Sequence, residues 1–324
     1  MKNTLIALIG VCCGFLYSCT EVEPLSLQNP YEYDEAYYRN LREYKASDHQ
    51  VCFGWLSDIS FTHCPGCRFL GIPDSLDICS LWGGIPSDVP GKHNTFYNPQ
   101  VHEEMRFVQK VKGTKMTFVT FPGVGSHPWL KDIPEDKRVQ AFGDSLLRIV
   151  YDNDLDGMDL DNEIQGDWMD GENFIKLLEY LGQYIGPKGK DKSKLLIVDG
   201  WPISRGYEYL NYFVAQAYYC RGAYNLQSRY ESARSGGCPP EKYIVAETIA
   251  ETPLGGELFT DAEGNTESVF PGEKLRSIEG MARWNPTQGK KGGFGGFCIQ
   301  YDYNNQPGYK YIRMGIQLQN PSKK

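Results

Sequence analysis

Four acidic residues at short, regular spacing are the strongest chemical signal in this sequence of 324 residues. Asp156, Asp159, Asp161 and Glu163 follow one another closely, with apolar residues between them. In a β-strand, side chains two positions apart share a face, so Asp159, Asp161 and Glu163 would point the same way, about 6.6 Å apart. Crowded carboxylates repel one another, which raises some of their pKa values and suits acid–base catalysis near neutral pH.

A calcium-binding loop and a solvated acidic turn are the alternatives to catalysis. An EF-hand loop that began at Asp156 would need glycine at its sixth position, where the sequence has Asp161. A solvated turn would not carry Leu155, Met158 and Leu160 among its acids. We therefore expect this segment to be catalytic, with no metal site.

The acidic segment lies in the fourth of eight predicted strands. From residue 51 onward, β-branched or aromatic runs alternate with helical periodicity, which is typical of β/α units around a parallel sheet. Eight such units predict an α/β fold, a single (β/α)₈ TIM barrel with its active site at the carboxyl ends of the strands. The predicted strands are 51–55, 76–82, 115–121, 155–161, 195–201, 213–218, 243–248 and 295–301, and the predicted helices are 99–111, 134–151 and 171–184.

The N-terminus has the pattern of an export signal. Lys2 precedes an apolar run at 5–16, which is too short to cross a bilayer as a helix. The following Leu16-Tyr17-Ser18-Cys19 resembles a bacterial lipobox. A non-lipidated signal, with Cys19 incidental, is the alternative. We expect Cys19 to carry a lipid anchor after removal of the signal peptide.

This interpretation divides the chain into three parts and predicts where the protein resides. Residues 1–18 would be the lipoprotein signal peptide, 19–48 a tether leading into the fold, and 49–324 the catalytic barrel. Glu21 and Glu23 resemble the surface-export signal of Bacteroidetes lipoproteins. We therefore expect an outer-membrane lipoprotein exposed on the cell surface, held to the membrane by its lipid.

Composition excludes one class of partner and leaves another open. The formal net charge is −8, and nucleic-acid binding needs clustered Lys and Arg, so we expect no nucleic-acid partner. The chain has 22 Tyr, 15 Phe and 6 Trp, which serve either in a core or as stacking surfaces for sugars. Cys64-Pro65-Gly66-Cys67 is compatible with a disulfide, with free thiols or with metal or redox chemistry, although no second ligand pair accompanies it.

The pattern Asp-x-x-Asp-x-Asp-x-Glu, filled by Asp156, Asp159, Asp161 and Glu163, is the signature of glycoside hydrolase family 18. The chain resembles this family from its first predicted strand to its last. It is most similar to the bacterial endo-β-N-acetylglucosaminidase branch, particularly lipoproteins of Bacteroidetes. The resemblance implies a retaining enzyme in which the substrate's own 2-acetamido group is the nucleophile, without metal or cofactor.

The resemblance also implies a role for each residue of the motif. Glu163 would protonate the glycosidic oxygen and then act as a base toward water. Asp161 would orient the acetamido group and stabilise the oxazolinium, and Asp159 would share a proton or charge with Asp161. Asp156 would be a structural brace. Tyr218 would donate a hydrogen bond to the acetamido carbonyl.

Two departures from the chitinase pattern favour an endoglycosidase. Chitinases usually have Met-x-Tyr-Asp where this chain has Gln216-Ala217-Tyr218-Tyr219. The typical chitinase Trp of the last strand is absent from the region of Tyr301.

Several further residues fall at or just beyond the carboxyl ends of predicted strands. We expect a rim of aromatic side chains that stack on sugars, and acids or amides that bind sugar hydroxyls. These substrate-binding candidates are Trp55, Trp82, Trp129, Trp168, Trp201, Asp199, Gln216, Glu247 and Tyr301.

The expected function is hydrolysis of the GlcNAc-β-1,4-GlcNAc core of N-linked glycans by substrate-assisted catalysis. The alternatives are a chitinase and a non-catalytic surface glycan-binding lipoprotein on the same barrel. Binding-only relatives typically lose the catalytic acid, and Glu163 is present here. The expected partners are an N-glycan or another GlcNAc-containing oligosaccharide, the membrane, and other surface proteins of glycan uptake.

Overall fold

The computed structural model describes residues 33–57, 59, 66 and 68–321. Residues from Glu35 onward form one compact unit. The interpretations that concern Cys19, Cys64 and Cys67 lie outside the described residues. None of the described helices has the length and apolar character needed to cross a membrane.

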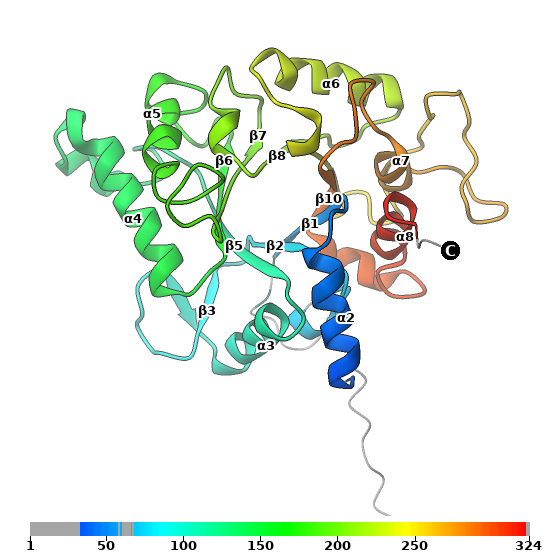
Figure 1. Ribbon diagram of the computed structural model, residues 1–324, viewed down its shortest axis with the longest axis horizontal. Helices are drawn as coiled ribbons and strands as arrows, with labels where there is room; N and C mark the ends of the chain where they lie inside the picture. The colour runs from blue at the N-terminus through cyan, green and yellow to red at the C-terminus, as the bar shows by residue number, and fades with distance from the viewer. Residues whose placement is uncertain (1–32, 58, 60–65, 67, 322–324) are drawn as a thin grey trace, which may run out of the picture. The chain divides into compact units, whose positions relative to one another are not determined.

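Eight parallel strands close into a barrel, which confirms the predicted fold (Figure 1). Around the barrel each strand pairs with the next, and the last pair joins β2 to β1. In this order the strands are β1 (Val51–Leu56), β10 (Gly293–Phe297), β9 (Tyr243–Thr248), β8 (Tyr212–Gln216), β7 (Leu195–Gly200), β6 (Gly157–Asn162), β5 (Lys115–Thr120) and β2 (Ile78–Leu81).

The last strand departs most from its predicted range. It begins at Gly293 and ends at Phe297, and residues Ile299–Asn304 form the 3₁₀ helix η8. Cys298 has a φ of 55°, which lies in the left-handed region and cannot continue a strand. The prediction that this strand reaches Tyr301 is therefore wrong by four residues.

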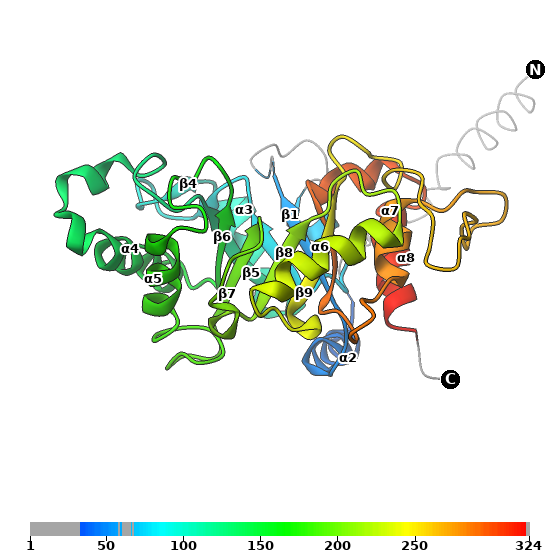
Figure 2. The same cartoon turned by 90° about the horizontal axis from the view of Figure 1, so that it is seen from above.

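Helices cover the outside of the barrel, as Figure 2 shows from above. Three were predicted: α3 (Pro99–Lys110), α4 (Arg138–Asp152) and α5 (Glu172–Leu181). Four were not: α2 (Glu35–Ala46), α6 (Ala223–Ser235), α7 (Ser277–Arg283) and α8 (Lys310–Gln319). Short 3₁₀ helices also occur at Phe69–Gly71, Pro128–Asp132, Glu135–Lys137, Tyr207–Tyr209 and Pro240–Lys242.

Helix α2 lies within the range expected to be a tether. Tyr38 is its buried residue and packs edge-to-face against Phe107 of α3. Arg42 donates a hydrogen bond to the carbonyl oxygen of Val111 at 2.8 Å. A helix with so narrow an apolar face has little of the periodicity that identifies helices from sequence, which explains why it was not predicted.

Each barrel strand alternates between two cores. Residues at one parity fill the barrel interior, among them Phe53, Trp55, Ile197 and Val214, which form one hydrophobic cluster. Residues at the other parity pack against the helices, as the apolar stripes of α4 and α5 do. The inward parity at the carboxyl ends of the strands therefore decides which side chains reach a substrate.

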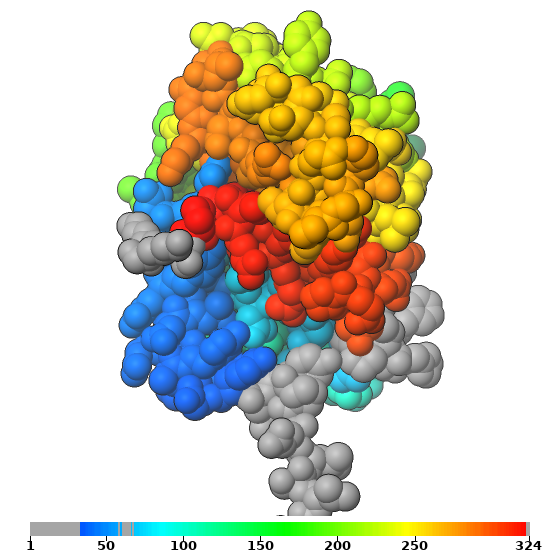
Figure 3. Space-filling model, turned by 90° about the vertical axis from the view of Figure 1, so that its right-hand side faces the viewer, coloured from blue at the N-terminus to red at the C-terminus, as the bar shows by residue number. Residues whose placement is uncertain are grey.

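Two insertions enlarge the mouth of the barrel. A two-stranded parallel sheet, β3 (Ile85–Ser87) and β4 (Thr95–Tyr97), precedes α3 and was not predicted. Residues 249–276 form a long loop between β9 and α7. In Figure 3 this loop lies on the surface beside α8, and Lys310 of α8 forms a 2.8 Å ion pair with Glu273 of the loop.

Candidate active site

Strand β6 places the acids of the motif on one face, as alternation predicted. Asp159 and Asp161 point into the barrel and are almost completely buried. Glu163 lies one residue beyond the end of the strand and is half-buried at the mouth. Met158 and Leu160, between the acids, belong to the outer core. The strand thus buries two carboxyl groups directly beneath a third that solvent can reach.

Asp159 is held by donors from strands β1 and β2. Its Oδ2 atom accepts hydrogen bonds from Trp55 Nε1 of β1 and Ser80 Oγ of β2, each at 2.9 Å. Burial raises the pKa of Asp159 to about 6, while the hydrogen bonds from Ser80 and Trp55 lower it. These donors favour the ionised form of Asp159 near neutral pH.

Asp161 has the opposite environment. The side-chain donor that reaches it is Gln216 Nε2, at 3.5 Å. Burial and, after it, the charges of Glu163 and Asp159 raise the pKa of Asp161 to about 9. Asp161 therefore holds a proton near neutral pH, as the crowding argument predicted for part of this motif.

Asp199 belongs to the same cluster, which corrects its expected role at the rim. It is the partner of Asp161 in the register of β6 and β7, and its side chain is inaccessible to solvent. Gln216 Nε2 donates to Asp199 Oδ2 at 3.0 Å. Because neither oxygen reaches the surface, Asp199 cannot bind sugar hydroxyls as expected.

Tyr218 stands at the mouth, just beyond β8. Burial, together with the charges of Asp199, Asp161 and Glu163, raises the pKa of its hydroxyl well above the usual value. The hydroxyl therefore stays protonated and is available as a hydrogen-bond donor.

Glu247 faces away from the barrel interior, which corrects the expectation that it binds substrate. It is buried, and its carboxylate accepts hydrogen bonds from Tyr219 N–H at 2.7 Å, Thr248 N–H at 2.9 Å and Ser277 Oγ at 2.5 Å. Tyr219 has a φ of 57°, so Glu247 braces a left-handed backbone turn directly after Tyr218.

The predicted aromatic rim is only partly present. Trp82, Trp129 and Trp201 are 37%, 41% and 63% exposed. Trp55 is buried inside the barrel beneath the mouth, and Trp168 is buried against Phe142 of α4, so neither offers a face to a sugar. These two assignments are corrected.

Phe297 takes a place at the mouth that the sequence analysis did not assign. Its ring centroid lies 6.1 Å from that of Trp55, 5.3 Å from that of Trp82 and 6.1 Å from that of Tyr218. Tyr301, which was expected at this strand end, is 39% exposed in η8 instead. A correct end for the last strand would have identified Phe297.

Asp156 lies at the other end of the barrel, just before β6. Its Oδ2 atom accepts hydrogen bonds from Gln109 Nε2 at 2.7 Å and from the Met116 backbone N–H at 2.9 Å. Lys115 Nζ lies 3.2 Å from Oδ1. This arrangement ties α3 and β5 to β6, far from the mouth.

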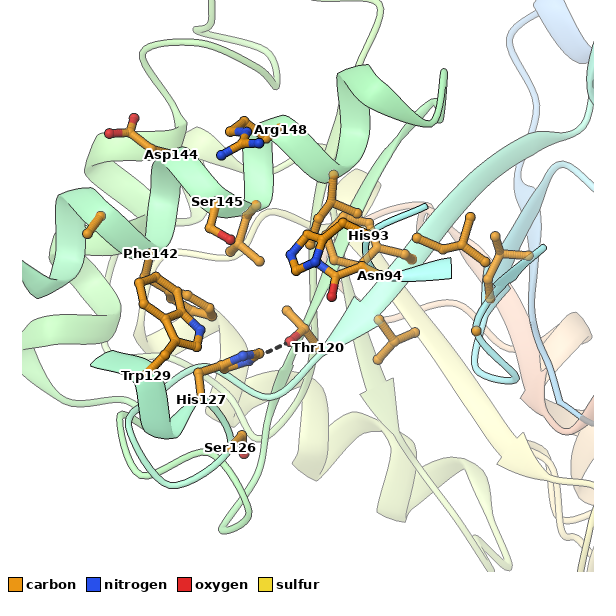
Figure 4. A pocket seen from close by; sticks show the side chains of 18 of the residues that line it. His93, Asn94, Thr120, Ser126, His127, Trp129, Phe142, Asp144, Ser145 and Arg148 are labelled. Carbon is orange, nitrogen blue, oxygen red and sulfur yellow. Dashed lines mark hydrogen bonds between the residues drawn. The ribbon is translucent and has the colours of Figure 1, made fainter. Parts of the chain in front are cut away.

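A cleft of about 760 Å³ opens beside the mouth (Figure 4). Trp82 and Val119 belong both to its lining and to the inward-facing strand ends. In Figure 4, His93 and Asn94 lie on one side of the cleft and Ser145 of α4 on another. Trp129 also lines it.

Polar groups are frequent in this cleft. Thr120 Oγ1 and His127 Nε2 form a 2.9 Å hydrogen bond, the dashed line of Figure 4. Among all described residues, no group of three or more His, Cys, Asp or Glu residues is arranged to hold a metal ion.

Comparisons with known proteins agree with this geometry. Residues 36–295 match the family model described as the endo-β-N-acetylglucosaminidase EndoS TIM-barrel domain. Endo-β-N-acetylglucosaminidase F2 of Elizabethkingia meningoseptica is 27% identical over 284 residues, which cover 81% of this chain and 77% of that protein. Endo-β-N-acetylglucosaminidase EndoS of Streptococcus pyogenes is 29% identical over 187 residues, 47% of this chain, and the match spans only 19% of EndoS.

Solved structures share the fold. The Bacteroides protein BT1044 superposes with a TM-score of 0.71 at 20% identity, covering 89% of this chain and 93% of that one. A family 18 chitinase from Flavobacterium johnsoniae superposes with a TM-score of 0.57 at 15% identity, covering 84% and 94%. The family model covers most of the chain, and its site residues lie on the expected strand, so the chain belongs to the endo-β-N-acetylglucosaminidase TIM-barrel family of the family 18 glycoside hydrolases.

Proposed function

We propose that the protein is a retaining endo-β-N-acetylglucosaminidase that hydrolyses the bond between the two core GlcNAc residues of N-linked glycans. The observation that carries the proposal is the arrangement of a solvent-accessible Glu163 above the buried acids Asp159 and Asp161, with the Tyr218 hydroxyl beside them. Substrate-assisted hydrolysis needs an acid that reaches the glycosidic oxygen and a buried acid that orients the acetamido group. Glu163 and Asp161 are placed for these two roles.

The first step breaks the glycosidic bond. Glu163 gives its proton to the glycosidic oxygen, while the carbonyl oxygen of the 2-acetamido group attacks the anomeric carbon. Tyr218 donates a hydrogen bond to that carbonyl and orients it. Asp161 accepts a hydrogen bond from the acetamido N–H. As it does so, it transfers its own proton to the neighbouring carboxylate of Asp159. The ionised Asp161 then stabilises the positive oxazolinium ring.

The second step restores the enzyme. Glu163, now a carboxylate, removes a proton from a water molecule, and the water oxygen attacks the anomeric carbon from the face that the leaving group left. The oxazolinium ring opens to the acetamido group, and the sugar retains its anomeric configuration. No covalent bond to the protein forms.

The cleft beside the mouth supports a branched substrate rather than a linear one. A linear GlcNAc polymer needs one groove across the mouth, whereas a branched glycan needs space for a second arm. The cleft meets the mouth at Trp82 and offers the exposed ring of Trp129 together with polar groups for hydroxyls. The resemblance to chitinases is below 25% identity and is a resemblance of fold alone.

Release of intact glycans tests the proposal. The protein is incubated with high-mannose and with complex N-glycoproteins, and free glycans are identified by mass spectrometry. We expect release with one N-acetylglucosamine left on the protein, and loss of release in the Glu163→Gln variant. Cleavage of chitin oligosaccharides with N-glycoproteins untouched would instead establish a chitinase, and binding without cleavage would establish a glycan-binding protein.

We also propose that Cys19 carries a lipid that anchors the enzyme to the outer membrane, facing outward. The lipobox-like segment before it and the acids Glu21 and Glu23 after it support this. Labelling of cells with a palmitate analogue should mark the wild type and not the Cys19→Ala variant, and protease treatment of intact cells should remove the protein. An unlabelled wild type would contradict the anchor, and protection from protease would contradict surface display.

A further inference from the structure

Three carboxyl groups, those of Asp159, Asp161 and Asp199, lie together inside the barrel. All three are buried, and no Lys or Arg is among the charged groups that act on them within the described structure. Three carboxylates cannot all be ionised in so dry a place without a cation, so protons must be held within the cluster. The hydrogen bonds show where.

Asp159 and Asp199 are diagonal neighbours on the inward faces of β6 and β7, because Asp199 pairs with Asp161 in the register of the two strands. Each uses Oδ2 for other donors: Trp55 and Ser80 on Asp159, and Gln216 on Asp199. Each has a buried Oδ1 atom with no hydrogen-bond partner among the described residues. A hydrogen bond between two carboxyl groups requires a proton on one of them, because a carboxylate oxygen only accepts.

The surroundings decide which partner holds that proton. Asp159 accepts an indole N–H and a hydroxyl, which stabilise its negative charge. Among the described residues, the donor to Asp199 is the neutral side-chain amide of Gln216, and two other acids lie beside Asp199. We propose that Asp199 is a carboxylic acid kept neutral, which donates its proton in a hydrogen bond to Asp159 and so holds Asp159 as an anion next to Asp161.

This inference rests on the proposed function and gives Asp199 a positioning role in it. Asp161 must lose its proton when the acetamido group binds, and the anionic Asp159 is the acceptor at hand. Asp199 would keep that acceptor in place and charged. The motif alone does not contain this residue, since Asp199 comes from β7 rather than β6.

Two substitutions of Asp199 test whether it acts as a neutral hydrogen-bond donor or as a charged carboxylate. Asparagine at this position keeps the shape and offers an N–H donor to Asp159, so Asp199→Asn should retain kcat within about threefold with an unchanged pH profile. Leucine offers no donor. Asp199→Leu should lower kcat at least about tenfold, with little change in KM, and move the acid limb of the kcat profile to higher pH, because Asp159 is then harder to ionise.

Besides Asp159, the titratable groups of this cluster are Asp161, Asp199, Glu163 and Tyr218, and only Asp199 is changed. Loss of activity in Asp199→Asn comparable to that of Asp161→Asn would overturn the proposal, because a charged Asp199 would then be required. Wild-type activity in a folded Asp199→Leu would overturn it equally.

Infrared spectroscopy gives a readout that does not depend on activity. A protonated carboxylic acid has a carbonyl stretch that a carboxylate lacks, so the wild type at neutral pH should show this band for Asp161 and Asp199. Asp199→Asn should remove one component and Asp161→Asn another. An unchanged band in Asp199→Asn would refute the neutral acid even if the protein released no glycan, so the two proposals fail separately.

Discussion

Strand β6 has an aspartate near each end, Asp156 and Asp161, and the two carboxyl groups have opposite surroundings. Before the strand, Asp156 accepts hydrogen bonds from Gln109 and Met116 on one oxygen and from the ammonium group of Lys115 on the other. At the mouth, Asp161 has one long contact with Gln216, and the acids Asp159, Glu163 and Asp199 are its neighbours. The two aspartates belong to one motif, yet one is supplied with donors and the other lacks them.

This difference teaches how the motif divides its work. A carboxylate with donors on both oxygens stabilises the fold and has no capacity left for chemistry. A buried carboxyl with few donors destabilises the folded state when ionised, and it is therefore ready to gain a positively charged partner. Catalysis is expected where the protein withholds hydrogen bonds.

The largest expected effect is on catalysis at the mouth. Asp161→Asn removes the group that would balance the oxazolinium charge, so kcat for glycan release should fall by about 10²–10³-fold. Asp156→Asn, a matched change before the strand, should leave kcat essentially unchanged. Equal losses in both variants would break the division between the two ends of β6. The measurement is initial rates on one N-glycoprotein at saturating concentration.

The next effect is on stability at the base of the barrel. Asp156→Ala leaves the Met116 N–H and the Gln109 amide without their acceptor, so the free energy of unfolding should fall by ~2–3 kcal/mol. Asp152→Ala, on the exposed end of α4, is the control and should change stability by less than ~0.5 kcal/mol. Urea unfolding followed by circular dichroism measures both. A stable Asp156→Ala would show that the brace contributes nothing.

At the mouth, replacing an acid should raise the free energy of unfolding rather than lower it. The pKa of Asp161 is about 9 in the folded protein, far above that of an aspartate in an unfolded chain, so the folded state binds a proton that the unfolded state lacks. The free energy of unfolding therefore falls as pH rises between these two pKa values. Asp161→Asn removes this loss and should be more stable than the wild type by ~1–2 kcal/mol at about pH 8, with the difference shrinking toward about pH 4. Thermal unfolding across that pH range would detect the trend, and a difference independent of pH would contradict it.

Alternation made part of the site predictable. The shared face of Asp159, Asp161 and Glu163 follows from strand geometry once the segment is recognised as a strand. The eight strands were readable because apolar runs, bounded by polar segments, alternate with helical periodicity. Those parts of the fold depend on local pattern, and the structure confirms them.

The sequence did not show whether Asp199 and Glu247 face the barrel interior or the surrounding helices. Each is an acid near the end of a barrel strand, but Asp199 points inward and Glu247 outward. Both strands are apolar at both parities, as buried parallel strands are, so no alternation tells which face an acid takes. Only the register of neighbouring strands settles it.

Long-range packing decided the remaining errors. Trp168 follows the acid motif closely in sequence, yet it packs on Phe142 from another β/α unit. Phe297 was missed because the strand ends in a left-handed turn at Cys298. This turn contains no glycine or proline from which a strand end could be predicted. Such contacts and turns depend on residues distant in the chain.

The smallest expected effect sharpens what holds Asp156. Lys115 is about half exposed, so its ion pair with Asp156 is screened by water and contributes at most ~0.5–1 kcal/mol. The buried hydrogen bonds from Gln109 and Met116 should carry most of the brace. Lys115→Met keeps the alkyl chain and should lower the free energy of unfolding by less than ~1 kcal/mol, and the cost should disappear at high salt. A loss as large as that of Asp156→Ala would mean that the cation, rather than the neutral donors, distinguishes the base of β6 from its mouth.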